Sequence, residues 1–443
     1  MQKAFEMVSA PALNLALVGC GTVGSGVVRI LQTHPQLLAL RAGRPLNLRR
    51  VVVRDLKRSR PVSLEGLEVS DDVSTILNDP SIQVVIQVVG GINPAREYMT
   101  SFLNAGKDVI TANKALLHAH GDELFQLAEK KGRTICFEAA VGGGIPVISA
   151  ITQALTGNQI LSIEAILNGT SNFILSKMLD GKQPYEEVLA QAQALGYAEA
   201  DPAIDVDGTD AAQKLSILTQ LAFGTRVTLE QIVRQGIQNL ELMDLQVAAE
   251  LGYRVKLLAT SRISRGRLEV SVQPTLIRAD RPVAQTSGAD NIVAIEGDAV
   301  GLIRLSGAGA GQMPTASAVV ADLVDYASGR AGITFQSLLR LRSREPLAIQ
   351  PPEDLSRRYY LRYMVADRPH VLADIADVLG RHNISISSVR QDETPDDVDD
   401  REGVARLVIM THRTTEGRLK AAGEEIDRLE SVRGLSIRLP MGD

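Results

Sequence analysis

A glycine-rich turn near the N-terminus constrains the fold of this chain more than any other feature of its sequence. Gly19-Cys20-Gly21-Thr22-Val23-Gly24 follows the apolar run Leu13–Val18, which predicts a strand, and leads into the helical pattern Val23–Leu31. In such G-x-G-x-x-G turns the first glycine permits a tight turn, the second lets the backbone approach a pyrophosphate, and the third allows close packing of helix on strand. The helix N-terminus then faces the anion. We therefore predict cofactor contacts at Gly19, Gly21, Thr22, Val23 and Gly24.

Short apolar runs alternate with helical patterns up to about residue 140. After the first strand, further strands are predicted at Leu48–Val53, Val84–Val89 and Asp108–Thr111, and a helix at Pro94–Asn104. Strands that alternate with helices at this spacing indicate a parallel, doubly wound sheet. We predict an α/β protein in which residues 1–140 form a Rossmann-like dinucleotide-binding domain.

Residues 141–340 differ in character from the first domain. Helical patterns dominate from Tyr185 to Leu251, and shorter β-like runs follow at Val255–Ile263, Leu268–Val272, Asn291–Ile295 and Ala299–Leu305. This mixture predicts an α+β domain for substrate binding, catalysis and dimerisation, with a return to the nucleotide domain near residues 307–325. The polar, proline-rich stretch at 341–358 is the predicted linker.

After the linker, the order of patterns is strand, helix, strand, strand, helix, strand. The segments are Tyr359–Val365, Pro369–Arg381, Ile384–Arg390, Val404–Thr411, Thr415–Leu429 and Leu435–Leu439. The order βαββαβ predicts a ferredoxin-like domain over residues 359–443. The acidic connection at 392–403 is expected to be a mobile surface hairpin.

The composition excludes several classes of protein. At 443 residues the chain is too long for one ordinary core, so two or three domains are expected. A formal net charge of −5 gives no basic field for nucleic acid, and no apolar run is long enough to cross a bilayer. Cys20 and Cys136 are too few for a disulfide framework, and the N-terminus lacks the pattern of a secretory leader. We expect a cytoplasmic enzyme whose partners are small molecules, not nucleic acid or membrane.

The end of the second predicted strand bears on the choice of cofactor. An acidic side chain there would accept the ribose 2′-hydroxyl of NAD, whereas arginine favours the 2′-phosphate of NADP. Arg54 and Lys57 favour NADP, while Asp55 leaves NAD as an alternative. Gly90, which follows the strand Val84–Val89, is assigned to the cofactor site as well.

A cluster of carboxylates precedes a lysine in the middle of the chain. Five acidic residues lie between Glu199 and Asp210, ahead of Lys214. Such a cluster repels itself unless it faces solvent, a metal or a cationic substrate, and the protonated amine of an amino acid fits this requirement. A calcium loop is the competing interpretation, although the EF-hand spacing is absent. Asp210 and Lys214 share a helix face, and Lys114 follows the strand Asp108–Thr111, where open α/β sheets bind ligands.

Six segments together resemble one enzyme family. GCGTVG, VITANKALL, FEAAVGGGIPVI, LNGTSNFIL, GYAEADPAIDVDGTDAAQKL and GAGAGQMPTASAV are similar, in this order, to homoserine dehydrogenase. The resemblance covers the whole catalytic portion. It implies NAD(P)-dependent interconversion of L-aspartate 4-semialdehyde and L-homoserine in threonine, methionine and isoleucine biosynthesis. It also implies a homodimer through the middle domain, with a homotetramer through the C-terminal domain as an alternative.

The resemblance implies roles for the residues at matching positions. Lys214 is expected to protonate the carbonyl oxygen during reduction, and Asp210 to orient Lys214. Burial would lower the pKa of the Lys214 amine toward the working range. The implied substrate contacts are Glu199, Asp205, Asp210 and Lys114, and the further cofactor contacts are Lys114, Gly196 and Gly311.

A glycine-rich loop after the nucleotide domain matches the monovalent-cation site of the family. The resemblance implies that Glu138 and the backbone carbonyls of Val141, Gly143 and Ile145 hold a monovalent cation, with sodium the expected ion. Oxygen ligands suit such a hard cation. On the residues alone, this loop is a hinge between domains.

Residues 359–441 resemble an ACT domain, a small effector module of amino-acid metabolism. The turn Asp367–Leu372 follows the pattern D-x-P-G-V-L, except that His370 stands where the pattern has glycine. Because this turn often lies against the effector, an amino-acid effector would meet an altered pocket; on the residues alone, His370 is an exposed residue at a helix start. Feedback by threonine is a hypothesis that fails if added threonine changes neither activity nor thermal stability.

Two other functions are compatible with parts of the sequence. A semialdehyde dehydrogenase would use Cys136 as nucleophile, but the run Ile135-Cys136-Phe137 predicts a buried strand without a partner histidine. A sensor that binds NAD(P)H and an amino acid without turnover would have no need of the pair Asp210 and Lys214. His118 and His120 suggest a metal only weakly, because two such ligands without others usually form a polar loop.

Overall fold

A computed structural model describes residues 10–198, 201–393 and 403–442 of the chain. The chain forms two compact units, neither of which is continuous in sequence. The first unit comprises Met1–Ile163, Gln213–Val227 and Asn291–Leu347, and the second comprises Glu164–Ala212, Thr228–Asp290 and Ala348–Asp443. Among the described residues, none of the helices combines the length and the hydrophobicity that a membrane crossing requires.

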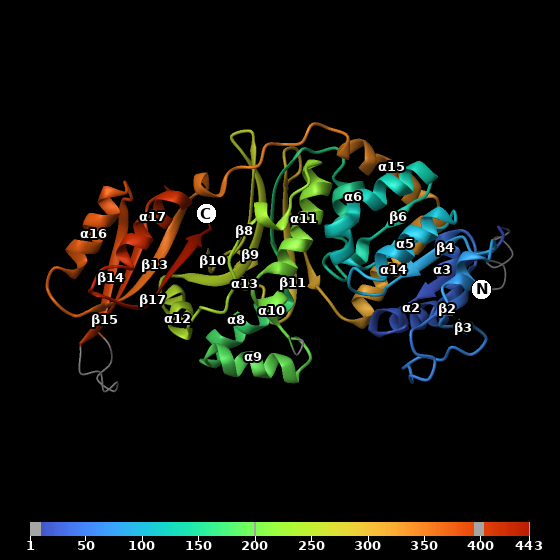
Figure 1. The fold of residues 1–443 in the computed structure, drawn as a ribbon, viewed down its shortest axis with the longest axis horizontal. Helices are drawn as coiled ribbons and strands as arrows, with labels where there is room; N and C mark the ends of the chain where they lie inside the picture. Colours follow the sequence, from blue (N-terminus) through green and yellow to red (C-terminus); the bar gives the residue numbers. More distant parts are fainter. Residues whose placement is uncertain (1–9, 199–200, 394–402, 443) are drawn as a thin grey trace. The chain divides into compact units, whose positions relative to one another are not determined.

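The first unit is built on a six-stranded parallel sheet in the order β3-β2-β1-β4-β5-β6 (Figure 1). Its strands are β1 (Leu13–Val18), β2 (Leu46–Val52), β3 (Glu68–Ser70), β4 (Val84–Gln87), β5 (Asp108–Thr111) and β6 (Ile135–Cys136). From β1 the strands are added first toward one edge of the sheet, as β2 and β3, and then toward the other edge, as β4, β5 and β6. The boundary between β1 and β4 is the topological switch point of a Rossmann sheet. The predicted parallel, doubly wound sheet is therefore confirmed.

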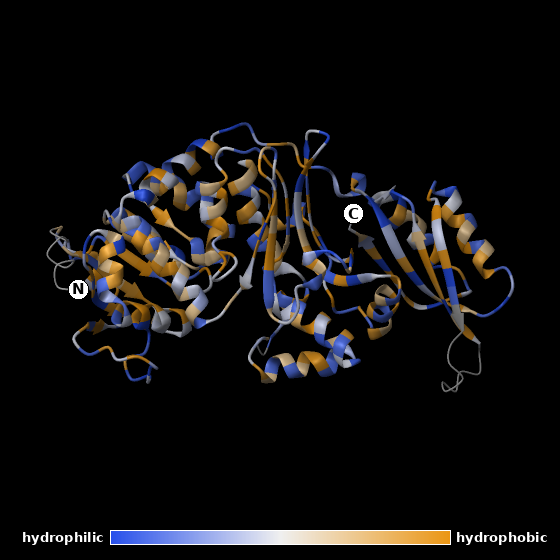
Figure 2. Ribbon diagram, turned by 180° about the vertical axis from the view of Figure 1, so that it is seen from behind, coloured by the Kyte–Doolittle hydropathy of each residue, from blue (hydrophilic) through white to orange (hydrophobic). Residues whose placement is uncertain are grey.

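The central strands β1 and β4 are almost entirely apolar because helices cover both faces of a parallel sheet. Val84, Val85 and Ile86 of β4 have no exposed surface, and Figure 2 shows the strands as hydrophobic over most of their length. The helices of this unit are α2 (Thr22–Thr33), α3 (Pro35–Ala42), α4 (Ser74–Leu77), α5 (Ala95–Asn104), α6 (Lys114–Lys131), α7 (Val147–Ser149), α14 (Gln312–Ala327) and α15 (Arg330–Arg342), with the 3₁₀-helix η1 (Glu138–Ala140) and the π-helix η2 (Ala150–Ala154).

Helix α14 packs directly on α2, although almost 300 residues separate them in the chain. A Cβ atom on Gly26 of α2 would lie 2.7 Å from the Cβ of Ala316 on α14, so the two helices cross at a contact that only glycine permits. Val319 and Leu323 of α14 belong to the same buried core as Leu15 and Val27. A late segment of the chain thus completes the core beneath the glycine-rich turn.

A second sheet begins at β7 (Ile160–Ile166), the strand in which the chain passes from the first unit to the second. On the first-unit side, its neighbours follow the order β12-β11-β7, with β11 at Asp290–Gly297 and β12 at Gly301–Ala308. Helix α11 (Thr209–Phe223) also crosses the division between the units along its length.

Within the second unit, the strand order is β9-β10-β17-β13-β15-β14, with β8 beside β10 and β16 beside β13. The strands are β8 (Val233–Arg234), β9 (Tyr253–Ser264), β10 (Arg267–Arg278), β13 (Ser356–Ala366), β14 (Ile386–Glu393), β15 (Val404–Thr411), β16 (Thr414–Thr415) and β17 (Val432–Met441). The helices are α8 (Gly169–Gly181), α9 (Tyr185–Ala194), α10 (Ala203–Val206), α12 (Leu242–Glu250), α13 (Pro282–Gln285), α16 (Val371–Arg381) and α17 (Glu416–Ile426), with short 3₁₀-helices η3 (Leu229–Gln231) and η4 (Pro352–Asp354).

The C-terminal elements confirm the predicted βαββαβ order and form a sheet in the order β17-β13-β15-β14. The sequence did not predict how this sheet continues into its neighbour. Leu276 of β10 pairs with Met441 of β17, and the carbonyl oxygen of Leu276 accepts the N–H of Gly442 at 2.8 Å. The predicted linker is attached to the same strand, because the N–H of Leu268 donates to Ala348 and the N–H of Gln350 donates to Leu268. The acidic connection lies largely outside the described residues, at 394–402.

His370 occupies the N-cap of α16 with φ +76°, and its side chain is exposed. This left-handed conformation favours glycine, because other residues bring their Cβ close to the backbone there. The backbone geometry thus explains why the ACT pattern has glycine at this position, and the chain keeps the turn in spite of the larger side chain.

A buried ion pair joins the C-terminal sheet to the preceding part of the second unit. The Arg362 side chain on β13 is 1% exposed, and it donates through Nε to Oδ1 of Asp244 on α12 at 2.7 Å. Its Nη2 atom donates to Asp244 at 3.2 Å and to Glu241 at 3.1 Å. Burial raises the pKa of Asp244, and the bonds from Arg362 oppose that shift.

We expect Arg362→Met to lower the free energy of unfolding by about 3–5 kcal/mol, because it leaves the Asp244 carboxylate buried without its cation. The matched control is Arg278→Met, which removes an arginine from an exposed pair with Asp280 and should change stability by less than about 1 kcal/mol. Urea unfolding of the three proteins measures both effects. Equal stability of the two variants would contradict a structural role for the buried pair.

Candidate active site

The turn between β1 and α2 has the geometry that the glycine motif predicts. Gly19 adopts φ +95°, and a Cβ atom there would lie 3.2 Å from Cγ2 of Val89. A Cβ on Gly24 would lie 2.1 Å from the carbonyl oxygen of Gly19, so only glycine lets the helix pack against the strand. A Cβ on Gly21, in contrast, would meet nothing within 4 Å. The backbone is therefore open at the N-terminus of α2, where a pyrophosphate would approach.

The loop after β4 forms the second side of the switch point. The buried Asn113 donates through Nδ2 to the carbonyl oxygens of Val89 at 2.9 Å and Gly91 at 2.6 Å. Its Oδ1 atom accepts the N–H of Leu116 at 3.0 Å and so caps α6. This one side chain fixes the loop around Gly90 against the start of α6, directly beside Lys114. Sequence analysis gave Asn113 no role, although asparagine before a helix is a recognised N-cap signal.

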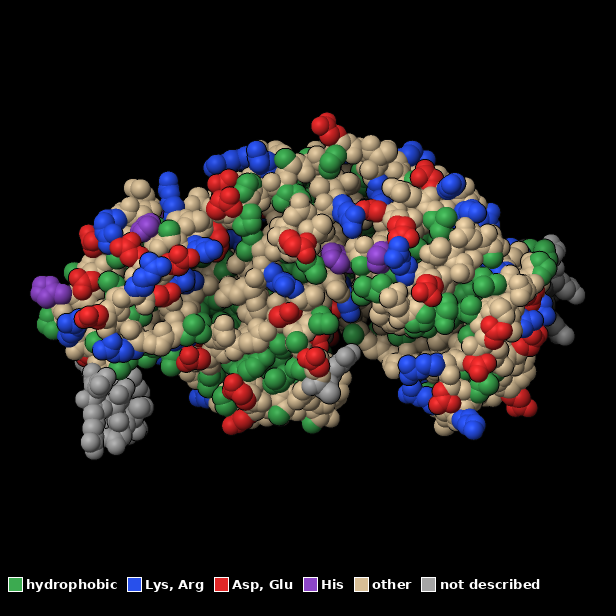
Figure 3. Space-filling model, in the orientation of Figure 1, with side chains coloured by type: hydrophobic (Ala, Val, Ile, Leu, Met, Phe, Trp, Pro, Cys, Tyr) green, Lys and Arg blue, Asp and Glu red, His purple; other side chains and the backbone are tan. Residues whose placement is uncertain are grey.

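Basic side chains follow β2 at the edge of the nucleotide turn. Arg54, Lys57 and Arg58 are exposed, and Figure 3 shows Lys and Arg side chains gathered over the loop after β2. The carboxylate of Asp55 accepts the N–H of Lys57 at 2.8 Å within its own turn. One oxygen of the Asp55 carboxylate thus bonds within its own turn, and Asp55 and the cations around it are all exposed.

Two parallel helices carry the two lysines that sequence analysis selected. The Nδ1 atom of His118 on α6 lies 2.6 Å from Oγ of Ser216 on α11, and Gln220 of α11 donates to Asp122 of α6 at 3.1 Å. Both pairs have the same separation of 98 residues, so the helices run parallel and in register over one turn. Ser216 donates its own proton to the Gln213 carbonyl at 2.8 Å, so His118 is the donor to Ser216.

This register places the lysines at corresponding ends of the two helices. Lys114 lies one turn before His118 on the same side of α6. Lys214 lies two residues before Ser216 on α11. The polar pairs between α6 and α11 therefore determine the relative position of the two lysine backbones.

In the second unit, one asparagine holds two of the predicted substrate carboxylates. Asn168 donates through Nδ2 to Oδ1 of Asp205 and to Oδ2 of Asp210, each at 2.8 Å. Its Oδ1 atom accepts the N–H of Ser171 at 2.7 Å and caps α8. Asn168 is 4% exposed and Asp210 3% exposed. A neutral amide thus brings two carboxylates together.

The turn at Gly196 is attached to the same helix. Gly196 follows α9 with φ +75°, and a Cβ there would meet nothing within 4 Å. Thr170 donates through Oγ1 to the carbonyl oxygen of Tyr197 at 2.6 Å, and the Tyr197 ring lies 4.9 Å from the Phe173 ring. Glu199, a predicted substrate contact, lies outside the described residues.

The predicted site residues fall into one set in each unit. The first unit holds Gly19, Gly21, Thr22, Val23, Gly24, Arg54, Lys57, Gly90, Lys114, Glu138, Val141, Gly143, Ile145, Lys214 and Gly311. The second unit holds Gly196, Asp205 and Asp210. In the first unit Asn113 connects the loop around Gly90 to the start of α6, and in the second unit Asn168 connects Asp205 and Asp210.

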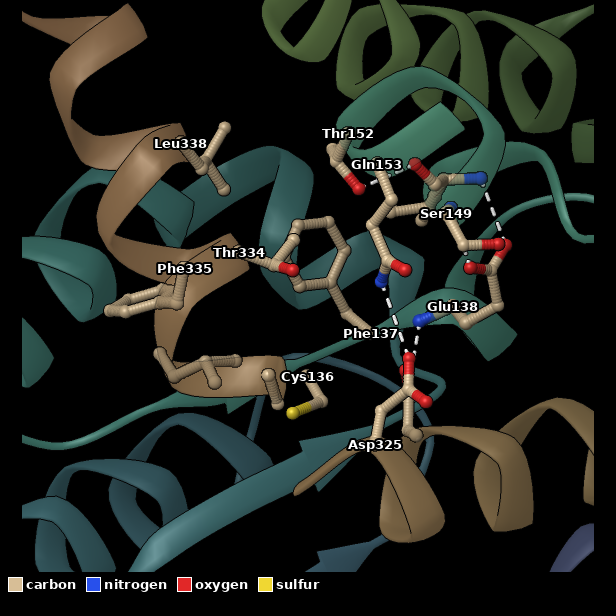
Figure 4. A pocket seen from close by; sticks show the side chains of 14 residues that line it. Cys136, Phe137, Glu138, Ser149, Thr152, Gln153, Asp325, Thr334, Phe335 and Leu338 are labelled. Carbon is tan, nitrogen blue, oxygen red and sulfur yellow. Dashed lines mark hydrogen bonds between the residues drawn. The ribbon is translucent and has the colours of Figure 1, made fainter. Parts of the chain in front are cut away.

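The carboxylate of Glu138 accepts hydrogen bonds from two backbone N–H groups. Its two carboxylate oxygens accept the N–H groups of Ile148 at 2.8 Å and Ser149 at 2.7 Å, at the start of α7 (Figure 4). Burial raises the pKa of Glu138, and these two bonds oppose the shift. The N–H of Val147 donates to the carbonyl of Ile145 at 2.8 Å. Any cation in this loop would therefore depend on backbone carbonyl oxygens more than on the Glu138 carboxylate.

The glycine-rich loops around Gly143 and Gly309 lie against each other. A Cβ on Gly143 would lie 2.5 Å from the carbonyl carbon of Gly309, and Gly311 begins α14 with φ +119°. The side chain of Asn291 lies against Gly309 and is 1% exposed. Within the described residues, neither its amide oxygen nor its amide nitrogen has a hydrogen-bond partner. A buried polar group without partners next to the Gly143 loop is compatible with a polar or ionic occupant there.

The thiol of Cys136 does not fit the role of a nucleophile. Burial raises its pKa well above the usual value, and the carboxylates of Asp322, Asp108 and Asp325 add to the shift. A thiolate is therefore disfavoured.

The histidines of α6 do not form a metal site. The Nδ1 atom of His120 lies 3.5 Å from Oε2 of Glu123. In the described part of the chain, no group of three or more His, Cys, Asp or Glu side chains is arranged to hold a metal ion.

A Rossmann sheet with an open glycine turn at its switch point is typical of a dinucleotide-binding protein, the class to which nicotinamide-dependent oxidoreductases belong. Comparison with known sequences agrees. The profile described as homoserine dehydrogenase, NAD binding domain, matches residues 19–138, that described as homoserine dehydrogenase matches 146–324, and an ACT domain matches 359–431.

Full-length relatives are similar to this chain from end to end. The homoserine dehydrogenase of Pseudomonas aeruginosa is 40% identical over 433 residues, which are 96% of this chain and 98% of that protein. The enzyme of Bacillus subtilis is 38% identical and covers 95% of this chain and 96% of its own. The solved structure of a homoserine dehydrogenase from Thiobacillus denitrificans covers 98% of each chain with a TM-score of 0.90 at 40% identity. The chain therefore belongs to the homoserine dehydrogenase family of NAD(P)-dependent oxidoreductases, and it carries a C-terminal ACT domain.

We expect His118→Leu to lower kcat about ten- to hundred-fold while the KM for the cofactor changes less than about two-fold, because a small displacement of the lysines impairs the chemical step. His118→Asn keeps a donor near the position of Nδ1 and should recover most of the activity. Gln220→Leu removes the pair one turn further from the lysines and is the matched control. Steady-state kinetics with both substrates distinguishes these effects; wild-type kcat in His118→Leu would exclude a positioning role.

Proposed function

We propose that this chain reduces L-aspartate 4-semialdehyde to L-homoserine with NADPH, and catalyses the reverse oxidation. The observation that carries the proposal is the pair of carboxylates held by Asn168. Both substrates have a protonated α-amine, and two carboxylates held close together by a neutral amide are suited to attract that cation.

Lys214 is the proposed general acid in reduction and the general base in oxidation. The nicotinamide supplies or receives the hydride, and Lys214 gives a proton to the developing alkoxide oxygen or removes it in reverse. Asp210 precedes Lys214 by four residues on α11, so both side chains lie on one face of the helix. Lys114, Gly196 and Glu199 complete the proposed surroundings of the substrate, with Asp205 beside Asp210.

We expect Lys214→Ala to lower turnover by about 10²–10⁴-fold, the range for loss of a general acid. Binding of NADPH, measured by fluorescence titration, should persist. Lys177→Ala, on the exposed side of α8, is the matched control and should leave turnover unchanged. Consumption of NADPH with L-aspartate 4-semialdehyde is the assay, and undiminished turnover in Lys214→Ala would remove Lys214 from the mechanism.

NADP is the proposed cofactor, with NAD as the alternative. The support is the pair of exposed cations Arg54 and Lys57 after β2, beside an Asp55 carboxylate of which one oxygen accepts the N–H of Lys57. The glycine turn and Gly90 would receive the pyrophosphate and the neighbouring ribose, and Gly311 would contact the cofactor from the start of α14.

We expect Arg54→Gln to lower kcat/KM for NADPH roughly ten- to hundred-fold, which corresponds to one charge-assisted hydrogen bond. The value for NADH should stay within about two-fold, because NADH has no 2′-phosphate. Arg41→Gln, at the exposed end of α3, is the control for a general loss of positive charge. A parallel fall for both cofactors would contradict the assignment.

A monovalent cation, with sodium as the proposed ion, belongs to the loop that contains Glu138, Val141, Gly143 and Ile145. The support is the unpartnered amide of Asn291 beside Gly309 and the supply of carbonyl oxygens in the loop. Glu138 would act mainly by holding α7, since its carboxylate bonds Ile148 and Ser149. Omission of sodium from the turnover assay tests this site.

The organisation of the chain is part of the same proposal. We assign residues 1–140 to cofactor binding, 141–340 to substrate binding, catalysis and dimerisation, and 359–443 to regulation, with 341–358 as the connection. A homodimer or homotetramer in the cytoplasm and an amino-acid effector at the ACT domain accompany this assignment. The φ +76° of His370 supports an unchanged path of the effector turn, with a larger side chain on it.

A further inference from the structure

A cavity of about 270 Å³ lies in the second unit at the C-terminal end of α8. Its walls come from the last turns of α8, from α12, from α13 and from the first residues of β9, which pack together (Figure 1). Along the axis of α8, the lining residues Leu175 and Leu179 lie roughly 10 Å and 16 Å from Asn168, at about 1.5 Å per residue. The lining includes neither Asn168 nor the two carboxylates that it holds, so the cavity is separate from them.

Two cations of β9 line the same side of this cavity. Arg254 and Lys256 are two residues apart in the strand, so their side chains project from the same face. The one carboxylate in the lining is Asp180, whose side chain is exposed at the rim. Positive charge thus exceeds negative charge in the cavity wall.

Lys256 is a buried cation that has only neutral acceptors. It is 4% exposed, and its Nζ atom donates to Asn172 Oδ1 at 3.0 Å, Ser176 Oγ at 3.3 Å and the Thr286 carbonyl at 2.7 Å. Burial lowers the pKa of Lys256 to about 8, with Asp180 opposing and Arg254 adding to the shift. These three acceptors use all three N–H groups of the ammonium, so Lys256 contributes positive charge to the cavity wall but no free hydrogen-bond donor.

The remaining walls of the cavity are largely aliphatic. They include Leu175, Leu179, Leu245, Val255 and Ala284. A ligand that matches this lining has a carboxylate toward Arg254, with the charge of Lys256 nearby, an ammonium group toward Asp180, and a short apolar side chain. The volume is slightly below the range of roughly 300–1,000 Å³ that drug-sized ligands occupy, so a small metabolite is the appropriate size.

We propose that this cavity is a binding site for a small aliphatic α-amino acid, distinct from the substrate site and from the ACT domain. Two of the three acceptors of Lys256 lie on α8, the helix that Asn168 caps. Occupancy is thereby coupled to the substrate carboxylates, and the coupling is reciprocal. This coupling rests on the function proposed above for Asp205 and Asp210, whereas binding in the cavity does not.

Isothermal titration calorimetry of the full chain with L-valine and with isovalerate, which lacks the amine, tests the site. We expect L-valine to bind more tightly than isovalerate. Arg254→Met should weaken L-valine binding roughly ten-fold or more, by the loss of a charge-assisted bond. Asp180→Asn should abolish the preference for L-valine over isovalerate. Arg267→Met, an exposed arginine of β10 on the same sheet, is the matched control and should bind as the wild type does.

Two results would overturn the proposal. One is no heat of binding for L-valine with the wild type, which would leave Lys256 a structural residue that joins α8 to β9. The other is unchanged affinity in both Arg254→Met and Asp180→Asn, which would place the ligand elsewhere, for example on the ACT domain. Turnover of L-aspartate 4-semialdehyde is measured separately, so failure of this site and failure of the proposed function are distinguishable.

Discussion

The close approach of α2 to β1 is the constraint on which the rest of the first unit depends. A Cβ on Gly24 would overlap the carbonyl oxygen of Gly19, and a Cβ on Gly26 would collide with Ala316 of α14. Only with glycine at both positions can a single helix lie against the first strand and against a helix from the far end of the chain. The turn that packs α2 against β1 also leaves the backbone at Gly21 open and directs the N-terminus of α2 toward solvent.

Much of the fold could be predicted from sequence because its signals are local. The strands Leu13–Val18, Asp108–Thr111 and Val404–Thr411 were predicted to the residue, since each is an apolar run bounded by turns. The short edge strand β3 was missed, because Glu68–Ser70 is exposed and carries no apolar run. The pairing of β17 with β10 was also missed, since register between distant strands leaves no local trace. Likewise, the proline-rich segment before β13 looked like a linker, whereas Ala348 and Gln350 pair with the backbone of β10.

The candidate site shows the same division between local and distant signals. Glycine spacing and the order of short motifs selected the residues, but no motif says that His118 and Ser216 hold two helices in register. Asn113 and Asn168 lie inside segments that sequence analysis quoted, and both carry the N-cap signal of asparagine before a helix. Their second function, as donors to Val89 and Gly91 or to two carboxylates, depends on chain segments about 22–42 residues away. Sequence spacing alone could not supply that information.

The continuous sheet of the second unit has a consequence for how this enzyme could be shortened. Removal of the chain after residue 355 would take β17 away from the end of β10 at Leu276 and would leave the Asp244 carboxylate without Arg362. Ser271 and Val272 of β10 would still pair with β8, so the larger cost is the buried charge left without its partner. A truncation meant to remove regulation would therefore destabilise the protein unless Asp244 were replaced as well.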